Sequence, residues 1–355
     1  MSPHQARDAR DSRRGFLRGC AGIAALALCP GPALANRNWD IFKRRFIVGG
    51  TRVIDTGNND VSHSESQGWG LLFAQSYDDR ETFRKLWEWT SASLQRGDGL
   101  FSWKWSPKSA DPVPDKNNAA DGDLLIAWAL VRAARKWKEP HWLEPARRIQ
   151  VAILDKLAND VPGGRVVLLP GIQGFVRGNR RIVNLSYYVW SAIHEFAGQP
   201  GEQARWRRLE ADGLWLLDNA AFGVHRLPPD WLLYGNQEFK IADGWPPYFG
   251  FDAIRIPLYL AWQNDKARLG RFLAAWRTPR FGGRPPAWIN LVDGSVAPFP
   301  SSGGYSAVAS VSQFVAGGMT GPPPLAALGD DDDYYSASLK LLSNLAAEEA
   351  ALTRR

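Results

Sequence analysis

Apolar residues recur at helical spacing along most of the chain, and few stretches show the two-residue alternation of a strand. In residues 79–94, for example, Phe83, Leu86 and Trp87 fall on one face, behind an aspartate suited to cap a helix. The same spacing predicts eleven helices, near residues 39–47, 64–76, 79–94, 120–137, 141–158, 186–197, 201–219, 250–263, 265–277, 304–317 and 334–351. The pattern therefore indicates a predominantly helical protein.

Four long loops rich in Gly and Pro separate these helices, at residues 97–119, 159–183, 222–249 and 278–303. Loops of this length in a compact helical domain usually carry function. Inside the second loop, residues 166–169 and 174–176 predict a short hairpin around Pro170-Gly171. No linker divides residues 36–355, so we expect one domain there.

The N-terminal 35 residues have the features of an export signal. Arg13-Arg14 lies in a segment that resembles a twin-arginine motif, and an apolar run follows from about Cys20 to Cys29. Ala33-Leu34-Ala35 offers a cleavage site, and the apolar run is too short for an ordinary transmembrane helix. We therefore expect a signal peptide over residues 1–35 and a periplasmic or secreted protein. A retained anchor or a chance arginine pair is the alternative.

Composition and charge narrow the possible functions. Cleavage would remove both cysteines, and it would lower the net charge from +7 to +4 because five arginines and two aspartates leave with the segment. No long basic run remains, so nucleic-acid binding is not supported. The five histidines show no ligand spacing, and we expect neither a metal nor another cofactor. Asp330–Asp333 is read as a helix cap, with a calcium site as the alternative.

Tryptophan is frequent, with 17 residues among 355. A pyranose presents an apolar face that stacks on aromatic rings, so these residues are candidates for a sugar-binding groove. Tryptophans also fill cores, and the composition alone leaves both interpretations open.

The stretch Ser64–Gly70 is the leading candidate for chemistry. It places one carboxylate, Glu65, among small residues, with Trp69 four positions on. Small residues beside an acid would let something large approach it, and the indole would give that group a flat face. We interpret Glu65 as the proton donor of a sugar-cleaving site.

Two other stretches bring further acids. Asp121 and Asp123 open the predicted helix at 120–137, where one aspartate suffices as an N-cap and the other is free to face a ligand. Asp252 and Arg255 stand three residues apart, so they share a face of a helical turn. A surface ion pair is the alternative, but the aromatic and apolar neighbours indicate a site away from water.

Together these stretches resemble glycoside hydrolase family 8, and in particular bacterial cellulases associated with cellulose synthesis. The resemblance spans about residues 39–320 and rests on four motifs: Ser64-Glu65-Ser66-Gln67-Gly68-Trp69-Gly70, Ala120-Asp121-Gly122-Asp123, Asn184-Leu185-Ser186-Tyr187 and Asp252-Ala253-Ile254-Arg255. The chain departs from the family pattern at Ser66 (usually Gly), Trp69 (Tyr), Ala120 (Ser or Thr) and Leu185 (Pro).

The resemblance implies an all-α (α/α)6 barrel whose long loops form a substrate cleft at one end. It also implies that Glu65 is the general acid and Asp252 the general base. Asp121 would stabilise the sugar at the cleavage point, although this position is sometimes described as a nucleophile in the family. Arg255 would orient Asp252, and Tyr187 would contact the sugar or the attacking water. In an inverting enzyme the acid and the base lie roughly 6.5–9.5 Å apart.

The substrate site is expected to include Trp69, Trp103 and Trp105 as stacking platforms, with Asp123 as a further contact. The alternative is that the tryptophans only hold the loop against the barrel. The expected substrate is a β-1,4-glucan, and the expected activity is endo-hydrolysis by a monomer linked to the cellulose synthase complex. Chitosanase, xylanase, a non-catalytic glucan-binding protein and a polysaccharide lyase are the alternatives.

Overall fold

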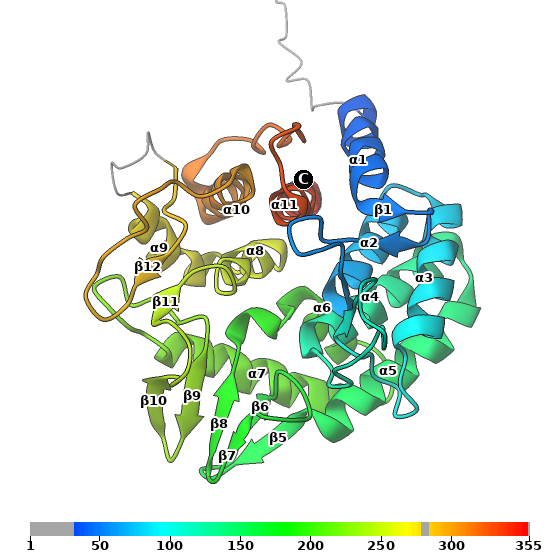
Figure 1. The fold of residues 1–355 in the computed structure, drawn as a ribbon. Coiled ribbons are helices and arrows are strands. Elements are labelled where there is room, and N and C mark those ends of the chain that lie inside the picture. The colour runs from blue at the N-terminus through cyan, green and yellow to red at the C-terminus, as the bar shows by residue number, and fades with distance from the viewer. Residues whose placement is uncertain (1–31, 278–283, 354–355) are drawn as a thin grey trace, which may run out of the picture.

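The computed structural model describes residues 32–277 and 284–353 and contains eleven α-helices in those ranges, at the positions that the periodicity predicts. Six of them form a closed inner ring in which each helix contacts the next and the last contacts the first (Figure 1). The ring consists of α2 (Ser64–Ser76), α4 (Ala120–Trp137), α6 (Trp190–Ala197), α8 (Arg255–Trp262), α10 (Gly303–Gln313) and α11 (Tyr334–Leu352).

Five helices pack around this ring from outside. Each covers an inner neighbour, and they are α1 (Pro32–Phe46), α3 (Arg80–Leu94), α5 (Leu143–Lys156), α7 (Gln203–Asn219) and α9 (Lys266–Trp276). Where a sixth outer helix would complete the set, the chain between α10 and α11 passes through one π-helical turn and the irregular residues 319–333. The predicted (α/α)6 barrel is thus confirmed, with one outer position filled by a loop.

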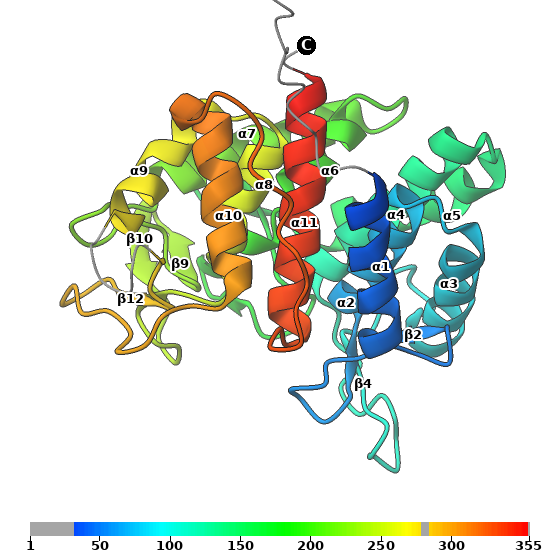
Figure 2. The same ribbon diagram turned by 90° about the horizontal axis from the view of Figure 1, so that it is seen from above.

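The short strands lie in the segments that connect the helices and are not part of the helical barrel. Four two-stranded ribbons pair β1 (Ile47–Val48) with β2 (Arg52–Val53), β3 (Ser62–His63) with β4 (Lys104–Trp105), β5 (Ala158–Val161) with β6 (Arg165–Leu168), and β11 (Tyr248–Phe249) with β12 (Ile289–Asn290). One four-stranded sheet has the order β10 (Glu238–Ile241), β9 (Leu232–Gly235), β8 (Arg180–Val183), β7 (Val176–Arg177). In Figure 2 the axes of α1, α10 and α11 are roughly parallel, and the segment with β4 projects past the end of the barrel.

The prediction of a hairpin around Pro170-Gly171 is wrong. β6 pairs antiparallel with β5, which precedes it, and β7 pairs with β8, which follows it. Both observed hairpins turn on glycines with positive φ, Gly163 and Gly164 in the first and Gly178 in the second, where a glycine meets no steric penalty. Turn chemistry therefore decided the pairing, and Pro170 serves instead as an acceptor for the backbone amide of Ala120.

Two glycines allow α2 and α4 to pack closely. A Cβ atom on Gly68 would lie 2.6 Å from the Cβ of Leu125, and one on Gly122 would lie 2.7 Å from the backbone nitrogen of Glu65. Real side chains do not fit at these distances, so only glycine permits the contact. The small residues near Glu65 thus admit a neighbouring helix rather than a ligand, which corrects the interpretation of Ser64–Gly70. The same contact places the start of α4 beside the start of α2.

The predicted signal peptide falls mainly on residues 1–31, which lie outside the described residues, and remains a prediction. α1 begins at Pro32, so the predicted cleavage site lies in its first turn. In residues 32–277 and 284–353, none of the helices combines the length and the apolar character that a membrane crossing requires.

Candidate active site

The first turns of several inner helices meet at one end of the barrel, where they line a cavity of about 480 Å³. Glu65 comes from α2, Asp121 from α4, Arg255 from α8 and Tyr334 from α11. The N-terminal end of a helix carries partial positive charge, so this arrangement favours acidic groups in the cavity. The other lining residues are Asp55, Gly57, Asn58, His63, Ser64, Trp103, Ala119, Tyr187, Phe251, Asp252, Asp333 and Tyr335.

Arg255 joins all three predicted catalytic carboxylates. Its Nη1 contacts Oε1 of Glu65 and lies 3.3 Å from Oδ2 of Asp121, while Nη2 donates to Oδ1 of Asp252 at 2.7 Å. Nη2 also donates to the hydroxyl of Ser186 at 3.0 Å. The guanidinium side chain is only 5% exposed, so the ion pairs are shielded from solvent. Motifs 190 residues apart in sequence (65 to 255) therefore meet at one buried cation.

The charge on this cluster requires at least one proton. One guanidinium faces three carboxylates, and a buried site does not hold two uncompensated negative charges. Burial raises the pKa of Asp121 to about 7, against the lowering effect of the Gly122 amide, which donates to Oδ1 at 2.8 Å. The cluster therefore keeps a shared proton near neutral pH, and a general acid at this site would have to carry it.

Asp252 and Glu65 are the accessible members of the cluster. Their side chains are 27% and 18% exposed, whereas Asp121 is 3% exposed. A ligand in the cavity can therefore reach Glu65 and Asp252 directly, while Asp121 lies deeper. Burial raises the pKa of Asp252 well above its usual value, and the negative charges of Asp230 and Asp121 raise it further.

Tyr187 lies at the cavity wall, with its ring 5.5 Å from the guanidinium carbon of Arg255. Burial raises the pKa of its phenol well above the ordinary value, and the charges of Asp121 and Asp252 add to the effect. A phenol that resists ionisation is a hydrogen-bonding group rather than a base. The raised pKa thus disfavours Tyr187 as the base that the lyase alternative needs.

Trp103 lines the cavity, as a stacking platform should. Its ring is stacked on His63 with centroids 5.9 Å apart and an interplanar angle of 8°, and its indole nitrogen donates to Asp115 at 2.8 Å. Burial lowers the pKa of His63 to about 4, so the imidazole is neutral at working pH. The paired rings present a flat, uncharged wall beside Glu65.

The other two predicted platforms lie elsewhere. Trp69 is completely buried in the core, where its ring packs against Tyr334 and Tyr335, so it offers no face to a sugar. Trp105 is not among the cavity-lining residues and packs edge-on against Trp89. The expectation that Trp69 forms a sugar platform is therefore wrong, whereas the platform role of half-buried Trp105 stays a prediction. Trp69 instead supports the tyrosines that line the cavity.

Asp123 also has a structural environment rather than a ligand-facing one. It is fully buried, and its carboxylate accepts hydrogen bonds from the Phe101 amide at 2.8 Å and from Asn118 Nδ2 at 2.7 Å. Burial raises its pKa to about 8. The two aspartates at the start of α4 thus divide their roles, with Asp121 facing the cavity and Asp123 anchoring the loop that carries Trp103.

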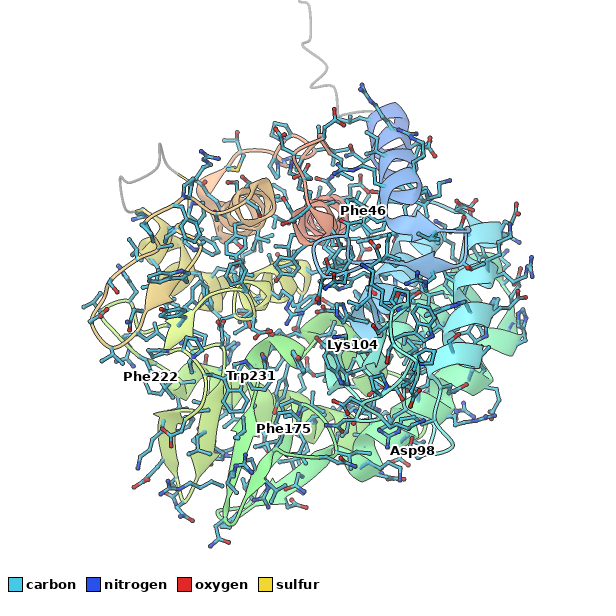
Figure 3. The ribbon with its side chains drawn as sticks, in the orientation of Figure 1. Phe46, Asp98, Lys104, Phe175, Phe222 and Trp231 are labelled. Atoms are coloured by element: carbon cyan, nitrogen blue, oxygen red, sulfur yellow. The ribbon has the colours of Figure 1, made fainter. Side chains whose placement is uncertain are left out.

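Several residues around the site were missed at the sequence level. Asn184 Oδ1 accepts from the Ser186 hydroxyl at 2.6 Å, and that hydroxyl accepts from Arg255, so the two residues hold the guanidinium from behind. The Asn-Leu-Ser-Tyr motif contained this signal, although only Tyr187 was assigned a role. Trp231 is different, because the long loop before Asp252 already makes it a weaker candidate for sugar stacking; it packs against Tyr187 and stacks on Phe175 with centroids 5.9 Å apart (Figure 3).

A larger cavity of about 930 Å³ lies between α4, α5, α6 and the start of α7. Its acids are already paired, Glu195 with Arg135 and Glu202 with Arg205. Within residues 32–277 and 284–353 there is no group of three His, Cys, Asp or Glu side chains suited to a metal ion. In the acidic run before α11, Asp333 caps the helix by accepting from the Ser336 amide, as the cap interpretation predicts.

Comparison with known proteins assigns the chain to a family. The model of the family described as "Glycosyl hydrolases family 8" matches residues 18–349. The chain belongs to this family. It is 40% identical to a "Probable endoglucanase" of Novacetimonas hansenii over 90% of this chain and 93% of that protein, and 41% identical to an "Endoglucanase" of Cellulomonas uda over 78% and 77%.

Solved structures agree with this assignment to family 8. Endoglucanase Cel10 of Klebsiella pneumoniae superposes with a TM-score of 0.82 at 39% identity, covering 88% of this chain and 99% of that one. The endo-β-1,4-glucanase CMCax of Acetobacter xylinum gives 0.82 at 39% identity, covering 90% and 99%. This family 8 member departs from the motif at Ser66, whose hydroxyl accepts from the His63 amide at 2.9 Å and so caps α2.

Proposed function

We propose that this family 8 hydrolase cleaves internal β-1,4-glucosidic bonds of cellulose or a related β-glucan with inversion of configuration. The observation that carries the proposal is the binding of Glu65 and Asp252 to opposite nitrogens of Arg255 inside one open cavity. The endoglucanase names of relatives about 40% identical support the substrate class.

In the proposed mechanism Glu65 donates a proton to the leaving glycosidic oxygen. Asp252 removes a proton from a water that attacks the anomeric carbon from the opposite face. Asp121, buried below them, stabilises the positive charge that develops on the sugar ring. Arg255 keeps Asp252 oriented, and its charge offsets the mutual repulsion of the carboxylates. The inverting outcome follows if one water fits between acid and base.

The cellular setting is part of the proposal. We infer export through the N-terminal segment of residues 1–35, a single catalytic domain over residues 36–355, action as a monomer in the periplasm or outside the cell, and a role beside cellulose synthesis. A deletion strain with unchanged cellulose yield and fibre form would count against the last point. Retention of residues 1–35 in the exported protein, measured by mass spectrometry, would contradict cleavage.

The activity is tested on hydroxyethyl cellulose, which is soluble and uncharged. Both reducing ends and viscosity are measured, because internal cleavage lowers viscosity at few new ends. The parent enzyme should be active, and Glu65→Gln should lose about 10²–10⁴-fold in kcat, the usual contribution of general acid catalysis. Glu88→Gln, a change at an exposed glutamate of α3, is the matched control and should keep parent activity. An inactive parent, or an active Glu65→Gln variant, would overturn the proposal.

One observation favours chitosan as a second substrate. Two further acids, Asp55 and Asp333, line the cavity beside the three catalytic carboxylates, and Arg255 is the only Lys or Arg among the described lining residues. Burial raises the pKa of Asp55 against the lowering effect of the Gly57 amide, and the negative charges of Asp333 and Asp60 add to the increase. A cationic glucosamine chain would gain from these negative charges. Chitosan turnover that falls in Asp55→Asn, with hydroxyethyl cellulose turnover unchanged, would support this second activity; equal effects on both would exclude it.

A further inference from the structure

A fourth carboxylate lies directly behind the turn that carries Asp252. Asp230 precedes β9, and its Oδ1 accepts hydrogen bonds from the backbone amides of Gly250 at 3.0 Å and Ala253 at 2.7 Å. Its own amide donates to the carbonyl of Tyr248 at 2.7 Å. These bonds bracket Asp252 on both sides in sequence, so Asp230 fixes the backbone from which Asp252 projects.

The packing at this point leaves little freedom. A Cβ atom on Gly250 would lie 2.9 Å from Oδ2 of Asp230 and 3.4 Å from the Cβ of Trp288. The carboxylate therefore sits against the backbone of the turn, and only a glycine gives it room. An asparagine has nearly the same shape, and its Oδ1 could accept the bonds from Gly250 and Ala253, so these two bonds alone do not explain why the residue is an acid. Its Nδ2 could not accept from the Asp252 amide, which also acts on the Asp230 carboxylate.

An aspartate at this position also adds a negative charge that an asparagine lacks. Burial raises the pKa of Asp230 to about 6, although the amides of Ala253, Gly250 and Asp252 oppose this shift. Its negative charge in turn acts on Asp252, where it raises the pKa more than any cause except burial. Two carboxylates held this close share protons as a pair, and ionisation of one makes the other a stronger base.

Other groups around Asp252 bear on the same equilibrium. Asp121 adds negative charge, Arg255 adds positive charge, and the side chains of Asn184 and Trp231 stabilise the ionised form. The phenols of Tyr187, Tyr305 and Tyr335 also face Asp252, and Tyr305 faces Asp230 as well. Each phenol stays neutral because burial raises its pKa well above the ordinary value. The acids around Asp252 thus include Asp121, Asp230 and, across the Arg255 guanidinium, Glu65, and of these three only Asp230 also binds the turn.

We propose that Asp230 is a positioning residue that aims Asp252 at the attacking water and strengthens it as a base. The inference rests on the proposed hydrolytic function of the same site. The amide bonds hold the direction of Asp252, and the charge keeps its proton affinity high enough to activate water near neutral pH. Arg255 limits the effect, because it draws Asp252 toward the ionised state. Asp230 itself is not among the residues that line the cavity.

The test compares Asp230→Asn with the parent over a range of pH. The Asn variant keeps the shape and loses the charge, so Asp252 should ionise more readily and the acidic limb of kcat/KM should move to lower pH by about one unit. The plateau rate should fall about threefold to tenfold, because a weaker base activates water less well. Asp212→Asn is the matched control. Asp212 is a buried acid that accepts from the Val166 amide at 2.9 Å, far from the cavity lining, so its loss should lower Tm without moving the limb.

A second measurement separates this proposal from the activity itself. In protein labelled with carboxyl-¹³C aspartate, the Asp252 resonance is identified by its absence in Asp252→Asn, and its titration is followed with and without Asp230→Asn. A downward shift of the Asp252 midpoint supports the proposal even if no glucan is hydrolysed. Unchanged titration and an unchanged acidic limb in folded Asp230→Asn would overturn it. If neither Asp230→Asn nor Asp230→Ser folds while Asp212→Asn does, Asp230 is purely structural and the proposal is also wrong.

Discussion

Replacing Arg255 with lysine tests whether the cluster depends on guanidinium geometry or only on positive charge. The two terminal nitrogens of Arg255 serve opposite sides of the site, with Nη1 on Glu65 and Asp121 and Nη2 on Asp252 and Ser186. Lysine keeps the charge but offers a single nitrogen, so it can hold one side only. Losing one charge-assisted hydrogen bond costs about 1.5–3 kcal/mol. If the bond positions Asp252 in the transition state, kcat should fall about 10- to 150-fold.

The assay is steady-state hydrolysis of hydroxyethyl cellulose, with Tm measured alongside. KM should change little, because only 5% of the Arg255 side chain is exposed and it offers a substrate little contact surface. Arg132→Lys is the matched control, since Arg132 is also a partly buried arginine, bound to Gln75 and Glu349 away from the cavity. That variant should lose stability but keep kcat. An Arg255→Lys enzyme with kcat within twofold of the parent would show that the bidentate geometry is unimportant and would refute the reasoning.

Three further outcomes are expected. Trp103→Ala should raise KM for cello-oligosaccharides about tenfold, and an unaltered KM in this variant would exclude Trp103 from the binding site. Trp69→Ala should instead lower the free energy of unfolding by about 3–5 kcal/mol. Asp123→Ala leaves two buried donors unpaired and should cost at least ~2 kcal/mol of unfolding free energy at unchanged KM. Burial raises the pKa of folded Asp123 to about 8, so the folded parent protein must ionise a buried acid as pH rises from about 4 to 8, and its free energy of unfolding should fall over that range. Denaturant melts should show a smaller fall in the Asp123→Ala variant. The first product released from cellopentaose should be the α-anomer by NMR, and a β-anomer would exclude inversion.

The helical architecture was predictable because it rests on periodicity and caps that act locally. Asp79 caps α3 by accepting from the Thr82 amide, and the apolar face behind it includes Phe83 and Leu86, as the pattern requires. Strand pairing was less predictable, since β5 to β8 are short and their partners were set by glycine turns. The missing outer helix had no sequence signal beyond the count of eleven.

The three carboxylates that meet at Arg255 could be picked out from sequence because each lies in a motif that resembles one of family 8. What surrounds them could not, because exposure depends on packing across the barrel. Trp69 follows Glu65 by four residues, yet its helix turns it into the core. Asp123 differs from Asp121 only in which side of the α4 terminus it faces. Asp230 lies 22 residues before Asp252, in the long loop 222–249 but in none of the motifs, and only the fold shows that it binds the same turn.

The most direct test of the account separates proton donation from water activation by changing the leaving group. A dinitrophenyl β-cellotrioside releases a phenolate that needs no proton, whereas a natural glucan releases an alcohol that does. If Glu65 is the acid and Asp252 the base, Glu65→Gln should stay within about tenfold of the parent on the activated substrate while losing about 10²–10⁴-fold on the glucan, and Asp252→Asn should lose activity on both. Equal losses for Glu65→Gln on the two substrates, or an active Asp252→Asn enzyme, would contradict the assignment of acid and base.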